Sequence, residues 1–284
     1  MEERLLFKPF GWKKDPRDMR DYLHRPTTAV IPDVFLMHIL LPSVRDQGNL
    51  GSCTGFGIGG NLTCTAKMYG QYSEWFSPTW IYNGGRKIAG DLLVDSGCYP
   101  RDNFEFIRQY GCLLEHFKPY RDTLDKTDPI TWGLNEEAAK WPIIEYFRVV
   151  DGIDYICNAL FEGNFISLGS PWYESWCEVG SDGVLPEDYS FIAGGHATFL
   201  YGYDKKKKVF HGQNSWGSSW GNGGLFEMPF SAIEQFKKDG GYDAHYPVVR
   251  WVDIPPPPPV VKKSKWWIWA LAGIAVVVAA ILLF

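Results

Sequence analysis

Apolar residues in the first half of the chain recur at the spacing of helices. The run SCTGFGIGGNLTCTAKMYGQY, which contains Cys53, predicts a helix that begins near this cysteine. The apolar positions on its rough common face are Phe56, Leu62, Ala66 and Tyr69. The runs SPTWIYNGGRKIAG and RDNFEFIRQYG predict two more helices, and the second has Asp102 in its first turn and ends at Gly111. The first half is therefore expected to be mainly helical.

From Phe147 onward the pattern changes to short runs that are typical of strands. These runs, broken by Gly, Pro and Asn, are FISLGSPW, ATFLYGYD, KVFHGQNSW and GLFEMPF. The charged run from Lys205 to Lys208 lies between two of them and is most simply a solvated hairpin turn. Helices followed by strands indicate an α+β fold with a cleft between the two parts.

The last stretch of the chain departs from both patterns. Residues 255–265 contain five prolines and three lysines, and no charge occurs from Trp266 to Phe284. At 1.5 Å per residue this run spans roughly 28 Å, close to the hydrocarbon thickness of a bilayer. A buried C-terminal core helix is the alternative, but the run is apolar on all sides and follows a stiff polyproline spacer.

These shifts in composition divide the chain into four parts. We predict an N-terminal extension over residues 1–30, a folded body over 31–254, a Pro/Lys linker over 255–265 and one transmembrane helix over 266–284. The lysines lie on the body side of the apolar run, so the positive-inside rule predicts a single-pass tail anchor with the body in the cytoplasm.

Composition and charge exclude several classes of function. The chain of 284 residues is 45% hydrophobic and 21% charged, as in globular proteins. Its net charge of −5 argues against nucleic acid as the main partner, because phosphate binding needs a basic face. The six cysteines show no C-x-x-C spacing, and the charged N-terminus lacks the apolar stretch of a secretory signal. A reducing compartment with mostly free thiols is therefore expected.

Four polar residues form a candidate catalytic set. Cys53 lies in DQGNLGSCTGFGIGG, and a helix N-terminus together with an imidazolium can lower a thiol pKa from about 8.5 to about 3–4. His196, in AGGHATFLYGYD, is the candidate imidazole. Asn214 can accept its second ring N–H, and Trp216 can shield that hydrogen bond from water. Gln47 can donate its amide to an oxyanion, beside the backbone N–H of Cys53.

These segments resemble the papain-like cysteine peptidases. DQGNLGSC, GGHA and NSWGSSWGNGG follow in that order, and 143 residues separate Cys53 from His196, inside the roughly 130–150 residue window of the family. The stretch DSGCYPRDNFEFIRQYG is similar to the family's segment on the unprimed side of the cleft. There a glycine pair offers its backbone to a substrate strand, and Gly97 and Cys98 stand at that pair.

The resemblance covers nearly all of the chain from Ile31 to about Trp251, and it implies a two-lobed papain-like fold. A helical lobe over roughly 46–145 would carry Cys53, and a β-barrel-like lobe over roughly 146–254 would carry His196.

The chain departs from the family pattern at several positions. Thr54 replaces the usual aromatic residue after the nucleophile, and Cys98 adds a side chain where substrate backbone should pass. The family's common disulfide would join the positions of Leu50 and Asp95, and the absence of both cysteines fits a cytosolic setting. The region before Ile31 is too short for the family's usual inhibitory propeptide. No zymogen step of that kind is expected, although a short N-terminal segment could still cover the cleft.

The sequence thus predicts a membrane-anchored cysteine endopeptidase that acts on polypeptides and requires no metal or organic cofactor. Cys53 would attack the peptide carbonyl, His196 would protonate the leaving amine, Asn214 would orient His196, and Gln47 would hold the oxyanion. Substrate contacts are predicted for Gly97, Cys98 and Trp216.

Two alternatives remain open at the sequence level. A transpeptidase or ligase would hand the acyl group to an amine at the same site. A non-catalytic, membrane-tethered peptide-binding protein would keep only the scaffold. The intact set of four residues argues against the second alternative, whereas Cys98 in the cleft leaves room for it.

Overall fold

The structure, a computed structural model, describes residues 9–70, 74–150, 152–249 and 251. The predicted linker and transmembrane helix, over 255–284, lie outside these residues. Within the described ranges, no helix is long and apolar enough to cross a membrane.

The three helices predicted from apolar spacing are present. They are α1 (Cys53–Met68), α2 (Pro78–Ala89) and α3 (Pro100–Tyr110). The Ser77 hydroxyl accepts the Trp80 N–H at 3.2 Å and so caps α2, and Gly90 ends it in the left-handed conformation that glycine adopts without strain. The remaining α-helices are α4 (Asn135–Ala138), α5 (Ile153–Phe161) and α6 (Ser231–Lys238).

Among the described residues, seven strands form one antiparallel sheet in the order β2-β7-β3-β4-β5-β6, with β1 paired to β4. They are β1 (Val34–Leu36), β2 (Ile143–Arg148), β3 (Ile166–Tyr173), β4 (Ile192–Asp204), β5 (Val209–Gln213), β6 (Leu225–Pro229) and β7 (Asp243–Val249). The four predicted runs correspond to β3, β4, β5 and β6, and Lys205–Lys208 forms the predicted turn. The pattern does not predict β1, β2 or β7. β1 has only three residues, and Pro247 interrupts β7.

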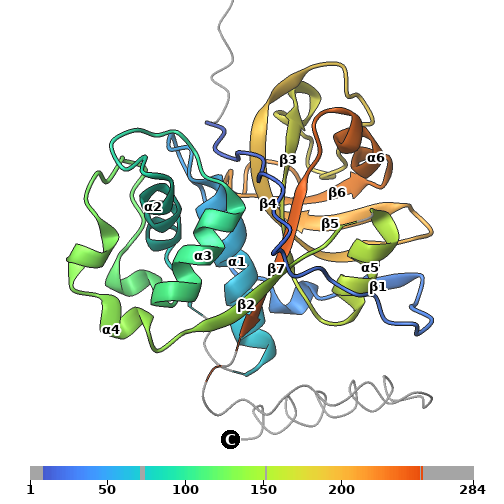
Figure 1. The fold of residues 1–284 in the computed structure, drawn as a ribbon. Coiled ribbons are helices and arrows are strands. Elements are labelled where there is room, and N and C mark those ends of the chain that lie inside the picture. The colour runs from blue at the N-terminus through green and yellow to red at the C-terminus, as the bar shows by residue number, and fades with distance from the viewer. Residues whose placement is uncertain (1–8, 71–73, 151, 250, 252–284) are drawn as a thin grey trace, which may run out of the picture. The chain divides into compact units, whose positions relative to one another are not determined.

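The helices and the strands enclose separate hydrophobic cores, and α1 lies between them (Figure 1). Ile58 and Leu62 of α1 belong to the helical core, whereas Cys64 belongs to the core of the sheet. The glycines of α1 permit this position. A Cβ at Gly57 would lie 2.8 Å from the Thr198 carbonyl oxygen of β4, so only glycine lets the helix backbone approach the strand this closely.

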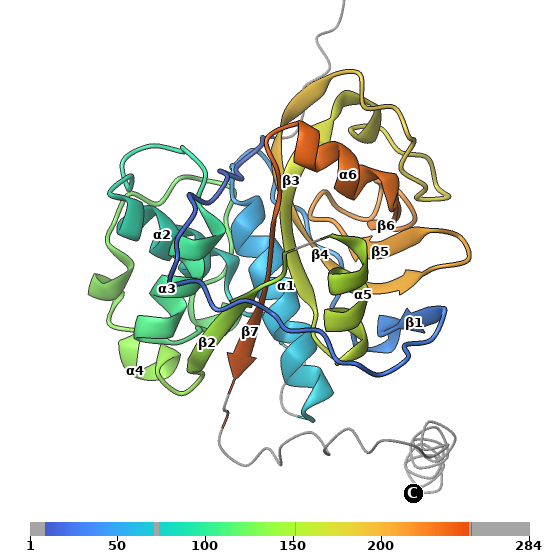
Figure 2. The same cartoon turned by 45° about the vertical axis from the view of Figure 1, so that its right-hand side comes forward.

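The segment that precedes β1 runs along the junction between the helices and the sheet (Figure 2). We call residues 9–27 the N-terminal strap. Its backbone pairs with both sides of the junction, because Trp12 forms a bridge with Cys98 and Leu23 forms a bridge with Arg148. The strap thus covers the region of the predicted catalytic residues Cys53 and His196, so a short N-terminal segment does lie over the predicted cleft.

Candidate active site

Cys53 is the first residue of α1, as predicted, and its side chain is fully buried. Interactions with the backbone of Ala197 and Gly11 act to lower the pKa of the Cys53 thiol and favour the thiolate. Burial acts in the opposite direction and is the larger effect, so it raises the pKa of the Cys53 thiol to about 12. The lowered pKa expected for a helix N-terminus is therefore not found while the site is buried.

His196 lies on β4 and is held by Asn214, which directly follows β5. The His196 Nε2 and Asn214 Oδ1 atoms are 2.8 Å apart. The same Oδ1 accepts the Ser215 backbone N–H at 2.7 Å. Because a backbone N–H can only donate, this contact identifies the amide atom as oxygen, and His196 Nε2 must carry the hydrogen. In the neutral ring Nδ1 is then an acceptor, and it has no hydrogen-bond partner among the residues that the structure describes.

Aromatic rings enclose the imidazole. The ring centroids of Trp216 and Trp172 lie 4.6 and 4.7 Å from that of His196. Burial among these rings lowers the pKa of His196 to about 4, although the Asn214 hydrogen bond acts to raise it. With the Cys53 pKa raised and the His196 pKa lowered, both groups are neutral near pH 7, and the pair holds a thiol and an imidazole rather than an ion pair.

The packing of α1 on β4 places the start of the helix, where Cys53 lies, next to this strand. Ala197, whose backbone acts on the pKa of the Cys53 thiol, directly follows His196 in β4. The thiol and the imidazole, 143 residues apart in sequence, therefore belong to one buried site at the N-terminal end of α1.

Gln47 is fully buried beside this site. Its Oε1 accepts the Ser215 hydroxyl at 2.7 Å, which fixes the amide so that Nε2 is directed toward carbonyl groups. Nε2 donates to the Leu50 carbonyl at 2.9 Å and to the Pro9 carbonyl of the strap at 3.1 Å. Gln47 Nε2 therefore donates to two backbone carbonyl oxygens from a fixed position, and its predicted role at an oxyanion stays a prediction.

The backbone at Gly97 and Cys98 is paired with the strap. The Cys98 N–H donates to the Gly11 carbonyl at 2.7 Å, and the Cys98 carbonyl accepts the Lys13 N–H at 2.9 Å. Gly97 has a φ of 74°, which favours glycine at this position. The peptide-binding role predicted for this backbone stays a prediction, but the pairing shows that an extended chain fits there.

The Cys98 side chain does not lie where the backbone of an extended chain would pass. Its sulfur donates toward the Tyr82 carbonyl of α2 at 3.4 Å and is fully buried in a small cluster with Leu50 and Tyr82, while its backbone bonds to the strap. The side chain therefore leaves the path of an extended chain free.

A hydrogen bond links the two segments that the family's common disulfide would join. The Gly51 N–H, next to Leu50, donates to the Asp95 carboxylate at 2.9 Å, and the Tyr82 hydroxyl bonds to the same carboxylate. All six cysteines lie in the described part of the chain, and none of them forms a disulfide.

The comparisons with known proteins agree with this geometry. Residues 36–236 match the model of the papain family cysteine protease. The chain belongs to the papain family of cysteine proteases. An uncharacterized peptidase C1-like protein of Acanthamoeba polyphaga mimivirus is 30% identical over 264 residues, which cover 82% of this chain and 85% of the viral protein. The cathepsin B-like CP3 of Giardia intestinalis is 26% identical over 66% of this chain and 64% of its own length.

Solved structures show the same fold. Xylellain, a cysteine protease from Xylella fastidiosa, superposes with a TM-score of 0.75 at 28% identity and covers 86% of this chain and 97% of its own. Bromelain from Ananas comosus superposes with a TM-score of 0.59 at 20% identity and covers 78% of this chain. The fold is thus the papain-like α+β fold, and the protein is a cysteine peptidase.

Sequence reasoning about this peptidase missed two kinds of residue. Ser215 bonds both Gln47 and Asn214, and it lies in the quoted NSW motif, which was the available signal. Strap residues Phe10 and Gly11 contact the catalytic groups, and no local pattern in the N-terminal sequence indicates this.

Proposed function

We propose that this papain-family peptidase is an endopeptidase in which Cys53 is the nucleophile, His196 the acid–base group and Asn214 its orienting partner. The observation that carries the proposal is the direction of the imidazole. Asn214 and Ser215 fix the hydrogen on His196 Nε2 and leave Nδ1 as a free acceptor. Ala197, the next residue of the same strand, lowers the pKa of the Cys53 thiol through its backbone, which supports a position of the thiol beside this strand.

The reaction follows from these positions. The thiol proton passes from Cys53 to His196 Nδ1, and the thiolate adds to the carbonyl carbon of the scissile peptide. The imidazolium returns a proton to the leaving amine as the C–N bond breaks, which leaves an acyl-enzyme. His196 then takes a proton from water, the hydroxide attacks the thioester, and the acid and the free thiol are released.

Gln47 supports the negative charge that develops on the carbonyl oxygen. Its Nε2 is held ready by the Ser215 hydroxyl on the other end of the amide, and it already donates to a carbonyl oxygen, that of Pro9. A donor that is fixed before the reaction stabilises an oxyanion without reorganisation.

Replacement of the nucleophile tests the proposal. We expect Cys53→Ala to lower peptide hydrolysis by the full chain about a thousandfold or more, because the covalent step is lost. A thiol-directed epoxide should label the unsubstituted chain with one equivalent at Cys53. Cys177→Ala is the matched control, since Cys177 is a half-buried thiol that none of the described catalytic residues contacts, and it should keep full activity and labelling.

Three results would contradict the proposal and favour one of the two alternative functions. Unchanged hydrolysis in Cys53→Ala, or no epoxide labelling at any pH, would favour a non-catalytic peptide-binding protein. Formation of an amide product in the presence of an added amine would identify a transpeptidase or ligase instead of an endopeptidase.

We further propose that residues 266–284 anchor the protein to a membrane, with the folded body in the cytoplasm. The support is the uncharged run itself, its length and the lysines on its N-terminal side.

A further inference from the structure

One side chain of the strap marks a pocket next to the predicted catalytic histidine. The strap runs past Cys98 as an extended chain, because the Gly11 carbonyl accepts the Cys98 N–H at 2.7 Å and the Lys13 N–H donates to the Cys98 carbonyl at 2.9 Å. Trp12 lies between these two bonds, and its own N–H donates to the Gly195 carbonyl at 2.9 Å. Gly195 directly precedes the histidine in β4, so the pocket that holds the Trp12 side chain adjoins the candidate active site.

Glycines on two neighbouring strands make room for the indole of Trp12. Gly169 lies on β3, and Gly195 lies on β4, which pairs with β3. An added Cβ would come within 2.2 Å of the indole at Gly169 and within 2.7 Å at Gly195. Glycine inside a strand is typical of places where another group approaches the backbone closely. The walls of the pocket are therefore backbone, and they admit a side chain of two fused rings.

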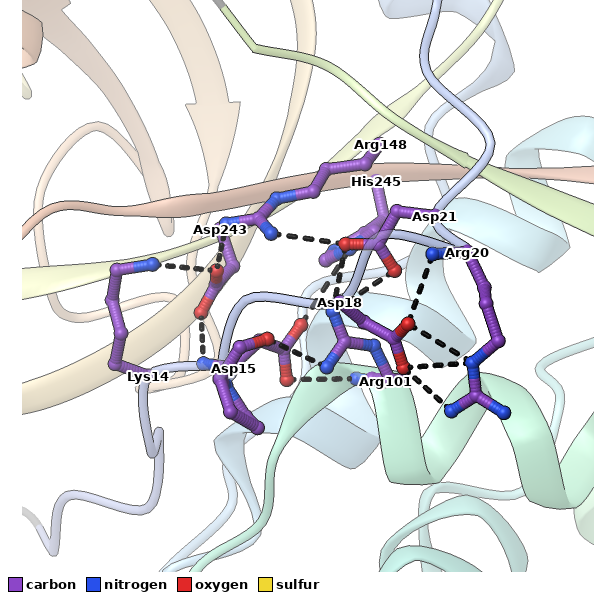
Figure 3. Close-up of polar contacts among 10 residues, drawn as sticks. Lys14, Asp15, Asp18, Arg20, Asp21, Arg101, Arg148, Asp243 and His245 are labelled. Carbon is purple, nitrogen blue, oxygen red and sulfur yellow. Dashed lines mark hydrogen bonds and ion pairs between the residues drawn. The ribbon is translucent and has the colours of Figure 1, made fainter.

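The base of the pocket is the buried carboxylate of Asp243, the first residue of β7, whose two oxygens have different partners. Oδ2 accepts two neutral donors, the Trp12 Nε1–H at 3.0 Å and the Asp15 backbone N–H at 2.8 Å. Oδ1 accepts two cations, Lys14 at 3.1 Å and Arg148 at 3.2 Å (Figure 3). The oxygen that the indole reaches is thus the one that neutral N–H groups satisfy.

A peptide that takes the place of the strap meets these two oxygens in different states. Oδ1 keeps Arg148, which belongs to the body and which then loses its strap partner Asp21. The charge of Asp243 therefore stays compensated. Oδ2 loses both of its donors, because Trp12 and Asp15 belong to the strap. A buried carboxylate oxygen without a donor is costly, so the incoming side chain must supply one. A second cation would have to be desolvated for a charge that is already paired.

Among the natural side chains, the indole meets all of these requirements. It is neutral, it has two fused rings, and its one N–H lies at the edge of the rings. Phenylalanine lacks the donor, tyrosine has its O–H at the tip of a single ring, and arginine adds a charge.

We propose that the pocket formed by Gly169, Gly195 and Asp243, which we call the indole pocket, selects the substrates of this peptidase by a tryptophan side chain. Asp243 is the residue that determines this specificity. The inference rests on the proposed function, because it names the substrate class of the same site. Binding of the side chain and hydrolysis of the peptide are therefore measured separately.

The first test measures binding in the full chain with Trp12→Ala, which empties the indole pocket. Thermal unfolding is followed with added indole and with benzothiophene, which has a similar two-ring shape but no N–H. We expect indole to bind about tenfold or more tightly, because benzothiophene leaves the buried oxygen without a donor. A second change, Gly169→Ala, should abolish this binding. Gly180→Ala in the same chain is the matched control, since its Cβ makes only an ordinary contact of 3.6 Å with Asp182.

The second test measures the ratio kcat/KM for peptides that carry tryptophan, phenylalanine, tyrosine or arginine at one position at a time. In wild type and in Trp12→Ala we expect tryptophan to be favoured about tenfold or more at a single position. This position should lie close to the cleaved bond, because the backbone of Gly11, the neighbour of Trp12, acts on the Cys53 thiol. Asp243→Asn, which keeps the size of the side chain but removes its charge, should lower the preference for tryptophan over phenylalanine.

A third measurement covers the case that Trp12→Ala does not fold. Urea unfolding of the full chain with Trp12→Phe or Trp12→Arg ranks side chains within the same pocket. The equilibrium constant of unfolding should rise about tenfold in Trp12→Phe and at least as much in Trp12→Arg, because the first lacks the donor and the second brings a charge.

The outcomes distinguish this proposal from the proposed function. Equal binding of indole and benzothiophene, an arginine variant as stable as wild type, or faster hydrolysis of arginine peptides overturns the indole pocket. Hydrolysis without preference at any position also overturns it and leaves the endopeptidase standing. Selective binding of indole without hydrolysis of any peptide supports the indole pocket and overturns the endopeptidase.

Discussion

At the residue scale, the site is a set of side chains whose directions are fixed by their neighbours. Ser215 holds Gln47 with its hydroxyl and Asn214 with its backbone N–H. Asn214 in turn places the hydrogen on His196 Nε2. The four candidate catalytic residues come from the residue types and their spacing in the sequence, and their catalytic roles stay predictions. Their protonation states were not, because these depend on burial by residues far away in sequence.

The pKa of His196 leads to a prediction about stability. Its folded pKa of about 4 lies below the ordinary 6.5, so the unfolded chain binds more protons between these values. The free energy of unfolding should therefore fall as pH decreases from about 6.5 to 4, and His196 contributes at most about 3 kcal/mol to the loss.

Urea unfolding at pH 7 and pH 4.5 measures this loss. The buried His24 and His245 and the half-buried His211 have pKa values shifted in the same direction, so wild type is compared with His196→Gln. The pH dependence should be smaller in His196→Gln by the contribution of the one imidazole. An equal dependence in both proteins would contradict the buried neutral state of His196.

At the scale of elements, α1, which begins with Cys53, packs closely on β4, the strand that carries His196. Gly57 meets the backbone of Thr198, and Gly60 meets the ring of Phe199, where an added Cβ would lie 2.4 Å from the nearest carbon. The glycine-rich composition of this helix, unfavourable for helix formation by itself, is explained by this approach. Sequence periodicity predicted α1 and β4 separately, and only the folded chain shows why the helix lacks side chains on that face.

Replacement of Gly57 tests this packing. In Gly57→Ala the added methyl would lie 2.8 Å from the Thr198 carbonyl oxygen, and because this atom belongs to the backbone, α1 and β4 must separate. We expect a loss of about 1–3 kcal/mol in the free energy of unfolding, as for overpacked cores. We also expect slower peptide hydrolysis.

Gly180→Ala is the control for this variant, since an added Cβ there makes only an ordinary contact of 3.6 Å with Asp182. Thermal unfolding and peptide hydrolysis of the two variants give the comparison. Equal stability of Gly57→Ala and Gly180→Ala would show that the helix and the strand are not held at this distance.

At the scale of the whole molecule, we expect consecutive parts of the chain to have different roles. The strap covers the catalytic site and the body carries it. The run over 266–284 lies outside the described residues, and its role as an anchor rests on the sequence.

Truncation before Lys262 tests the proposed anchor. The shortened chain should move from the membrane fraction to the supernatant after lysis, and it should hydrolyse peptides as fast as the full chain does, because every described catalytic residue precedes residue 252. A chain that ends at Lys265, which keeps the lysines but lacks the apolar run, separates electrostatic attachment from insertion. A truncated protein that still sediments with membranes would refute the anchor.

The sequence by itself determined the chemistry and the order of the elements. Residue types at fixed spacing predict roles for Cys53, His196, Asn214 and Gln47, and apolar periodicity predicts the main helices and strands, because both kinds of information are local. The tertiary structure alone decided that Cys98 turns its sulfur away from the strap and that the strap closes the site. These features depend on burial and on hydrogen bonds between segments that are distant in the chain, which no local pattern records.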